Sequence, residues 1–79
     1  MKTFHVTVAK VDEALYNGEA ISVYVPGAIG DMEVLANHEP LISFLRAGTI
    51  RVKKSDETLS FDIDGGTIEI SNSQATILL

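Results

Sequence analysis

The sequence predicts an all-β domain: a two-sheet antiparallel β-sandwich, or flattened barrel, of about eight to ten short strands. Apolar and polar residues alternate with a period of two along most of the chain, and β-branched residues are frequent at the apolar positions. Turn-forming residues interrupt this alternation about every eight to twelve residues. The 79 residues contain no linker, repeat or low-complexity segment, so residues 1–79 are expected to form a single domain.

The N-terminal part of the chain is expected to hold two clear strands and two turns. The alternating apolar residues are Phe4, Val6 and Val8 in the first strand and Ile21, Val23 and Val25 in the second. Between them, Asn17-Gly18 follows Tyr16, and Asn-Gly is typical of a type I′ hairpin turn. Pro26-Gly27 should end the second strand, because proline has no N–H for the ladder. Gly27 and Gly30 are expected to take positive φ in the reversal that follows.

The segment 39–46 lacks clean alternation and admits two structures. Pro40 is favoured at the first position of a helical turn. The same segment, closed by Gly48, can instead form a turn and a short strand. We favour the strand.

Two hairpins are expected in the C-terminal half, with registers set by the rule that inward residues face inward residues. For the first, Val52 is expected opposite Phe61 and Ile50 opposite Ile63, which leaves residues 55–58 as a loop and places Arg51 opposite Asp62. For the second, the expected pairs are Ile70 with Ala75 and Ile68 with Ile77. A polar turn at 71–74 joins these strands, Leu78 then points away from the core, and Gly65-Gly66 marks a tight link or bulge before them.

The predicted core collects the apolar residues that share one phase of the alternation. Its members are Phe4, Val6, Val8, Ile21, Val23, Val25, Ile50, Val52, Phe61, Ile63, Ile68, Ile70 and Ile77.

Composition and charge argue against several classes of function. The net charge of −5 disfavours a nucleic-acid partner, and Arg46, Arg51, Lys53 and Lys54 are expected to form a solvated hairpin face. With no cysteine and two histidines, neither a metal site nor a bound cofactor is expected. No apolar run approaches the roughly 20 residues that span a bilayer, and no signal segment is visible, so a soluble, cytosol-facing protein is expected.

No catalytic site is expected either. Catalysis by His38 would need a nucleophile and an orienting acid beside it, and no serine has the setting of a nucleophile elbow. His38 is expected to make a local hydrogen bond in its loop or to lie at an interface. Asp31, Glu33 and Glu39 crowd one loop region without the spacing of an EF-hand, and the simplest interpretation is a solvated loop.

Several short motifs follow one another in a characteristic order. They are Phe4-His5-Val6, Leu15-Tyr16-Asn17-Gly18, Val25-Pro26-Gly27 with Gly30-Asp31, His38-Glu39-Pro40-Leu41, Leu45 and Gly48 with Ile50-Arg51-Val52, Gly65-Gly66 with Ile68-Glu69-Ile70, and Ala75-Thr76-Ile77-Leu78. In this order and spacing the chain resembles the N-terminal β-sandwich domain of the epsilon subunit of F-type ATP synthases, which is called delta in mitochondria.

The resemblance implies a non-catalytic rotor part that binds the gamma subunit, rests on the membrane c-ring and couples proton flow to ATP synthesis. The resemblance places His38 beside the gamma contact and Asp31 toward the c-ring. From this placement, together with apolar residues that the core does not claim, we expect a gamma-binding face of His38, Leu41, Ile42 and Leu78. The expected c-ring face consists of Ile29, Asp31 and Glu33. Asp31 is expected at the tip of the turn, as a negative charge with no cation between Pro26 and Leu45.

The resemblance also implies a peripheral location, on the cytoplasmic face of a bacterial inner membrane or the stromal side of a plastid thylakoid. Family members usually continue into a helical hairpin, which is expected to be absent here because the sequence ends at Leu79. Three positions depart from the usual family pattern: Glu33 and Asn37 each replace a glycine, and Asp64 replaces a serine.

Two alternatives remain open. One is a lipoyl or biotinyl carrier domain, for which Lys53-Lys54-Ser55-Asp56 is the nearest candidate, although the flanking residues typical of a modified lysine are missing. The other is a plain β-sandwich interaction module.

Overall fold

The computed structural model describes residues 2–79, and nine strands run through them. They are β1 (Phe4–Lys10), β2 (Glu13–Ala20), β3 (Ser22–Gly27), β4 (Gly30–Leu35), β5 (Leu41–Leu45), β6 (Gly48–Lys53), β7 (Thr58–Ile63), β8 (Gly66–Ser71) and β9 (Gln74–Leu78). The strand favoured for segment 39–46 is therefore present as β5. Residues 2–79 include no helix with the length and apolar character needed to cross a membrane.

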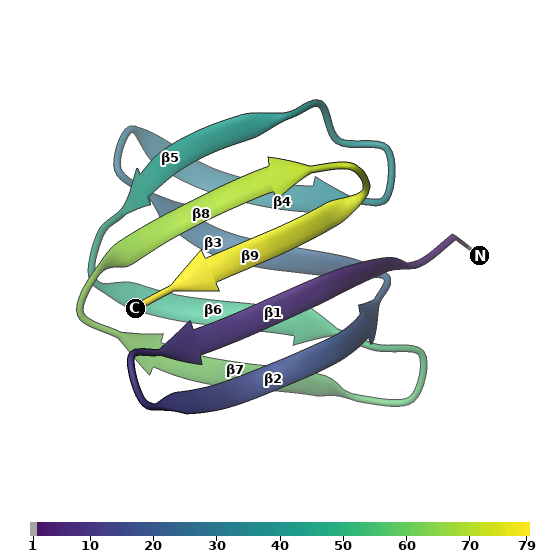
Figure 1. Ribbon diagram of the computed structural model, residues 1–79, viewed down its shortest axis with the longest axis horizontal. Coiled ribbons are helices and arrows are strands. Elements are labelled where there is room, and N and C mark those ends of the chain that lie inside the picture. Colours follow the sequence, from purple (N-terminus) through teal and green to yellow (C-terminus); the bar gives the residue numbers. More distant parts are fainter. Residues whose placement is uncertain (1) are drawn as a thin grey trace.

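The strands form one sheet that curls into two facing layers (Figure 1). One layer has the order β2-β1-β9-β8-β5, and the other contains β3 with β4 on one side and β6-β7 on the other. The layers are joined where Gly27 of β3 pairs with Leu45 of β5. The predicted all-β sandwich is confirmed, with one difference in detail. β1 and β9 run parallel, with Thr7 opposite Thr76, so the sheet is not wholly antiparallel.

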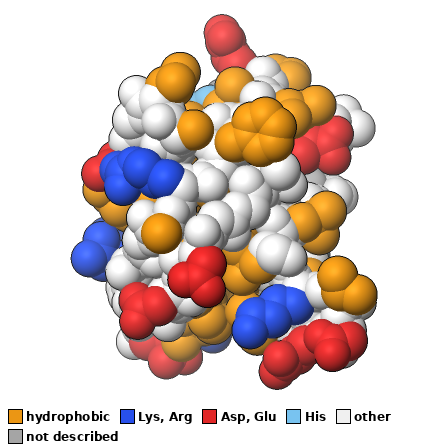
Figure 2. All heavy atoms as spheres, turned by 90° about the vertical axis from the view of Figure 1, so that its left-hand side faces the viewer, with side chains coloured by type: hydrophobic (Ala, Val, Ile, Leu, Met, Phe, Trp, Pro, Cys, Tyr) orange, Lys and Arg blue, Asp and Glu red, His pale blue; other side chains and the backbone are white. Residues whose placement is uncertain are grey.

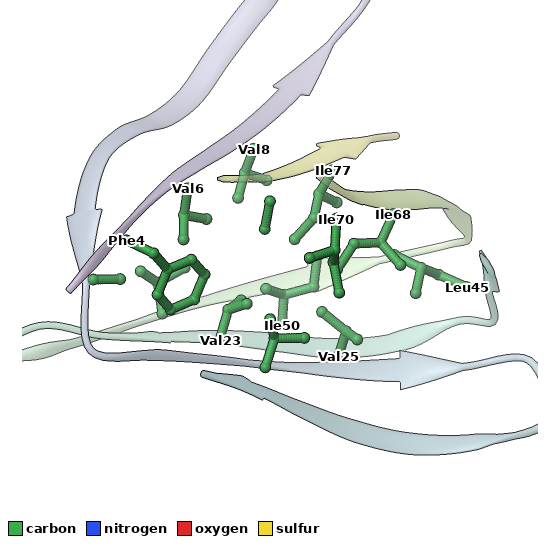
Figure 3. Packing of buried hydrophobic residues seen from close by; sticks show 14 of the residues in the cluster. Phe4, Val6, Val8, Val23, Val25, Leu45, Ile50, Ile68, Ile70 and Ile77 are labelled. Carbon is green, nitrogen blue, oxygen red and sulfur yellow. The ribbon is translucent and has the colours of Figure 1, made fainter. Parts of the chain in front are cut away.

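The core lies between the two layers, where side chains of β1, β8 and β9 meet those of β3 and β6 (Figure 3). Its buried members are Phe4, Val6, Val8, Ala20, Val23, Val25, Val34, Leu45, Ile50, Val52, Ile63, Ile68, Ile70, Ala75 and Ile77. Eleven of the thirteen residues in the predicted core are among them. The prediction was wrong for Ile21 and Phe61, which are half-buried. Ile21 lies at the bend between β2 and β3, and Phe61 lies on β7, a strand with a neighbour on one side.

The predicted register of the β6–β7 hairpin is wrong by two residues. Ile50 lies opposite Phe61 and Val52 opposite Leu59, so Arg51 faces Ser60 rather than Asp62. Asp62 instead lies opposite Thr49 and accepts a 3.0 Å hydrogen bond from its hydroxyl. The loop still has four residues, 54–57, and is closed by a 2.8 Å bond from the Lys54 N–H to the Glu57 carbonyl. A shift of two leaves every side chain on its predicted face, and alternation alone cannot detect it.

The predicted β8–β9 register is confirmed, with Ile70 opposite Ala75 and Ile68 opposite Ile77. Ser71 also pairs with Gln74, so the turn consists of Asn72 and Ser73, whose φ angles are 52° and 61°. Two consecutive positive φ values indicate a type I′ turn, which matches the twist of a hairpin.

The predicted hairpin turn at Asn17-Gly18 is wrong. Both residues lie inside β2, opposite Thr7 and Val6, and the chain reverses at residues 11–12 instead. The Tyr16 side chain covers Gly18, since a Cβ added there would lie 3.0 Å from the Tyr16 hydroxyl. Long pairing with β1 thus outweighs the local turn preference of Asn-Gly.

Around Pro26 the prediction was partly wrong. β3 continues through Pro26 and Gly27, and the carbonyl of Pro26 accepts a 2.9 Å bond from the Arg46 N–H. Gly30 has the expected positive φ, at 150°, whereas Gly27 does not. Gly27 is needed for another reason: an added Cβ would collide with the carbonyl oxygen of Gly30. The tight link at residues 65–66 is confirmed, and both glycines have positive φ.

Candidate functional site

The β3–β4 hairpin ends in a turn made by Ala28 and Ile29, because Gly27 pairs with Gly30. Ile29, one of the two turn residues, is 100% exposed. Asp31 was expected at this tip, but it lies one pair back, opposite Pro26. Figure 2 shows the end of the molecule that carries this turn, where hydrophobic side chains, an aromatic ring among them, gather in the upper part. The tip of the hairpin is therefore apolar.

The Asp31 carboxylate is engaged on both oxygens. Its Oδ1 atom pairs with the Arg46 guanidinium, and its Oδ2 atom accepts a 2.5 Å hydrogen bond from the Tyr24 hydroxyl. The hydrogen bond to Asp31 raises the pKa of Tyr24 above its ordinary value of 10.0, with smaller contributions from desolvation and from the negative charge of Asp31. Asp31 was expected to make the tip negative, whereas in the structure its charge is compensated by Arg46. Arg46 directly follows Leu45 in the sequence, and folding brings it to Asp31.

Glu33 lies two residues beyond Asp31 on the same face of β4, opposite Tyr24. It borders a shallow depression of about 340 Å³ that is also lined by Ser22, Arg51 and Lys53. Arg51 covers the Tyr24 ring, with its guanidinium carbon 5.3 Å from the ring centroid. The outer face of this layer thus carries an alternating set of acidic and basic side chains around one tyrosine.

His38 lies in the loop between β4 and β5 and is half-buried. Its Nδ1–H donates a 2.8 Å hydrogen bond to the carbonyl of Glu39, and its backbone N–H donates to the carbonyl of Leu35. This is the local loop hydrogen bond that the sequence suggested. This bond uses Nδ1 and does not involve Nε2, the other nitrogen of the ring.

The structure separates the two neighbouring candidates on β5. Ile42 points outward and is 75% exposed, whereas Leu41 is half-buried and packs against the core. Leu78 also points outward, as predicted, and is 54% exposed. Ile42 and Leu78 lie on the outer face of the same layer, on strands separated by β8.

Phe44 also lies on this outer face, and it was not among the interface residues expected from the sequence. It is 73% exposed and lies in one cross-strand row with Thr67 and Leu78. The spacing of two between Ile42 and Phe44 could have revealed it, since alternate residues of a strand share a face. We call Ile42, Phe44 and Leu78 the apolar outer face.

In the part of the chain that the structure describes, no three His, Cys, Asp or Glu side chains are grouped to hold an ion. The acidic residues Asp31, Glu33 and Glu39 are exposed, and Asp31 is held by a cation already in the protein.

Comparison with known proteins agrees with the fold. The family described as ATP synthase, Delta/Epsilon chain, beta-sandwich domain matches residues 3–79. The chain is 38% identical over 79 residues to an ATP synthase epsilon chain of Bordetella parapertussis and spans 56% of that protein. It is 40% identical over 78 residues to an ATP synthase epsilon chain of Caulobacter vibrioides and covers 91% of it. The chain thus spans little more than half of the first relative but most of the second.

A solved structure is similar over nearly the whole chain. It is a chain from the Euglena gracilis mitochondrial ATP synthase, solved as OSCP/F1/c-ring, and it aligns with a TM-score of 0.89 at 22% identity, over 96% of this chain and 49% of that one. At this identity the likeness concerns the fold alone. The match of the family over residues 3–79, together with relatives at 38–40% identity, shows that this chain belongs to the β-sandwich domain family of ATP synthase delta and epsilon chains.

Proposed function

We propose that this chain is a non-catalytic part of the rotor of a proton-translocating F-type ATP synthase. In this role it links the gamma subunit of the central stalk to the membrane c-ring and couples proton flow to ATP synthesis. The observation that carries the proposal is the match of residues 3–79 to a family named after this complex. The relatives are named as ATP synthase epsilon chains, and the similar Euglena structure contains a c-ring.

The proposed gamma-binding face consists of the apolar outer face together with the β4–β5 loop. Three large side chains, Ile42, Phe44 and Leu78, are exposed to water on one layer, and burying them against a partner would be favourable. His38 lies in the adjoining loop, and its Nε2 atom is not used in the bond to the Glu39 carbonyl. Leu41 supports the loop and strand from the inner side rather than by direct contact.

The proposed c-ring face is the β3–β4 hairpin. Ile29 is fully exposed at its tip, and Asp31 and Glu33 follow on one face of β4. The two faces belong to different layers, so one compact domain can contact two partners at once. The location that follows is peripheral to a membrane, through the complex, on the cytoplasmic face of a bacterial inner membrane or the stromal side of a thylakoid.

Co-purification with a tagged gamma subunit tests the proposal. The wild-type chain should be retained with gamma, and His38→Glu should weaken retention because it places a charge beside the apolar face. Ser60→Glu, at an exposed position of β7 in the other layer, is the matched control and should bind as the wild type does. A wild-type chain that folds but is not retained by gamma would overturn the proposal.

The carrier-domain alternative has a specific observation against it. Lys54 in the β6–β7 loop pairs with Glu57 at 3.4 Å, and its Nζ atom lies 5.9 Å from the centroid of the Tyr16 ring. A lysine held against its own domain is poorly placed to carry a swinging cofactor. An intact-mass measurement on the native protein checks this, with an unmodified mass expected.

A further inference from the structure

Three side chains on the outer side of the β3–β4 hairpin, those of Tyr24, Asp31 and Arg46, are linked to one another. Asp31 of β4 accepts from both Tyr24 of β3 and Arg46, which follows β5. Arg46 and Asp31 have side chains that are 51% and 43% exposed. An ion pair that exposed contributes little to global stability, so its consequence is local: it joins β4 to a part of the chain with which β4 has no strand pairing.

The turn end of the same hairpin is also held by backbone bonds on its β3 side. The Arg46 N–H donates to the Pro26 carbonyl, and the Ala28 N–H donates to the Phe44 carbonyl, each at 2.9 Å. These bonds fix the end of β3 and the first turn residue, Ala28, against the end of β5, and neither is made by a residue of β4. On the β4 side, the contact of Asp31 with Arg46 supplies the connection.

The charges lead to the same conclusion. Because Arg46 compensates Asp31, the pair presents little net charge to a partner approaching from outside. Ile29 projects beyond the pair and is wholly exposed. An apolar side chain at the tip of a two-residue turn gains most from burial when the turn is held in one direction before binding, since less conformational freedom is then lost.

We propose that Tyr24, Asp31 and Arg46 form a clamp that orients the hairpin, so that the c-ring is contacted by Ile29 while Asp31 is a positioning residue and not a direct ring contact. This inference rests on the proposed function, in which the hairpin faces the c-ring.

A charge-exchange experiment tests it, with the complex of this chain and gamma binding to detergent-solubilised c-ring. Asp31→Arg places two cations together, opens the clamp and should weaken binding about tenfold, as should Ile29→Ser. The double variant Asp31→Arg with Arg46→Asp restores an ion pair in reversed order and should recover affinity to within about threefold of wild type. Asp56→Arg in the β6–β7 loop makes the same change in net charge away from the hairpin and should bind normally.

A double variant that stays as weak as Asp31→Arg would overturn the clamp, because the anion at position 31 would then be contacting the ring itself. Amide hydrogen exchange on the isolated chain gives a readout that does not involve the ring. Exchange in residues 28–33 should be faster in Asp31→Arg than in wild type and slow again in the double variant. If the wild-type complex does not bind the ring at all, the proposed function fails, while exchange that is unchanged by Asp31→Arg would refute the clamp.

Discussion

The hydroxyl of Tyr24 donates a 2.5 Å hydrogen bond to the Asp31 carboxylate, across the antiparallel pair of β3 and β4. The bond stabilises the neutral phenol, because only the protonated hydroxyl can donate, and the negative Asp31 disfavours a second negative charge beside it. The ionisation of one tyrosine therefore reports whether the outer side of the hairpin is intact.

Titration of Tyr24 is expected to show this coupling directly. In a Tyr16→Phe background, which leaves Tyr24 as the sole tyrosine, tyrosinate absorbance should rise at a pH above the ordinary value of 10.0. Asp31→Asn should lower the pKa of Tyr24, because it removes the acceptor charge. The same pKa in both proteins would show that the hydrogen bond is not formed in solution.

The raised pKa also predicts how the free energy of unfolding depends on pH. A tyrosine whose pKa is higher in the folded state than in the unfolded state contributes stability below the unfolded pKa, and this contribution disappears as pH rises through the folded pKa. Urea unfolding from pH 9 upward should therefore show a loss of stability in wild type that is smaller in Asp31→Asn. A steeper loss in the variant would contradict a Tyr24 pKa that Asp31 raises on folding.

Burial predicts the ranking of three core and surface truncations. Ile50→Ala, at a fully buried position, should lower the free energy of unfolding by about 2–5 kcal/mol. Phe61→Ala should cost less, because Phe61 is half-buried on an outer strand. Ile42→Ala, on the apolar outer face, should stay within about 0.5 kcal/mol of wild type. Urea midpoints provide the measurement, and a loss for Phe61→Ala equal to that for Ile50→Ala would place Phe61 in the core after all.

Gly30 and Gly66 have similar φ angles, so substituting each by alanine distinguishes the cost of backbone strain from the cost of steric overlap. Gly30 has φ 150° with nothing within 4 Å of an added Cβ, whereas a Cβ on Gly66, at φ 153°, would collide with the Leu78 carbonyl oxygen. Gly30→Ala should cost about 1–3 kcal/mol from the unfavourable φ alone. Gly66→Ala should cost more, because the β8–β9 pairing must also shift. If the two variants lose the same free energy of unfolding in urea, the backbone around Gly66 and Leu78 shifts to accept the added Cβ at no extra cost.

The β8–β9 turn offers a stabilising change. Ser73 has a φ of 61°, and glycine takes this conformation without the penalty of a side chain, so Ser73→Gly should stabilise the protein by about 1 kcal/mol. Ser71→Gly is the matched control: Ser71 lies in β8, where glycine should weaken the strand. A thermal midpoint that falls in Ser73→Gly would contradict the type I′ assignment.

Local patterns in the sequence determined which side of each strand faces the core, and hence most of the buried set. They also determined the β8–β9 register, because a two-residue turn between Ser71 and Gln74 leaves no room for a shift. The same patterns could not determine the β6–β7 register, since a shift of two residues leaves every side chain on the same face of the sheet. A turn preference as strong as that of Asn17-Gly18 was likewise not decisive, because seven residues of β2 gain more by pairing with β1.

The residues of the candidate site also fall into two groups, those that local sequence patterns predict and those that only the tertiary structure brings together. The exposed outer face of β5 was visible in the alternation of Ile42 and Phe44, and the outward direction of Leu78 followed from its hairpin. Only the tertiary structure placed Arg46 beside Asp31, fifteen residues away, through the docking of the end of β5 against Pro26. It alone decided that β1 and β9, from the two ends of the chain, run parallel. The physical reason is that side-chain alternation is a property of neighbouring residues, whereas contacts between distant strands depend on how the whole apolar surface is buried.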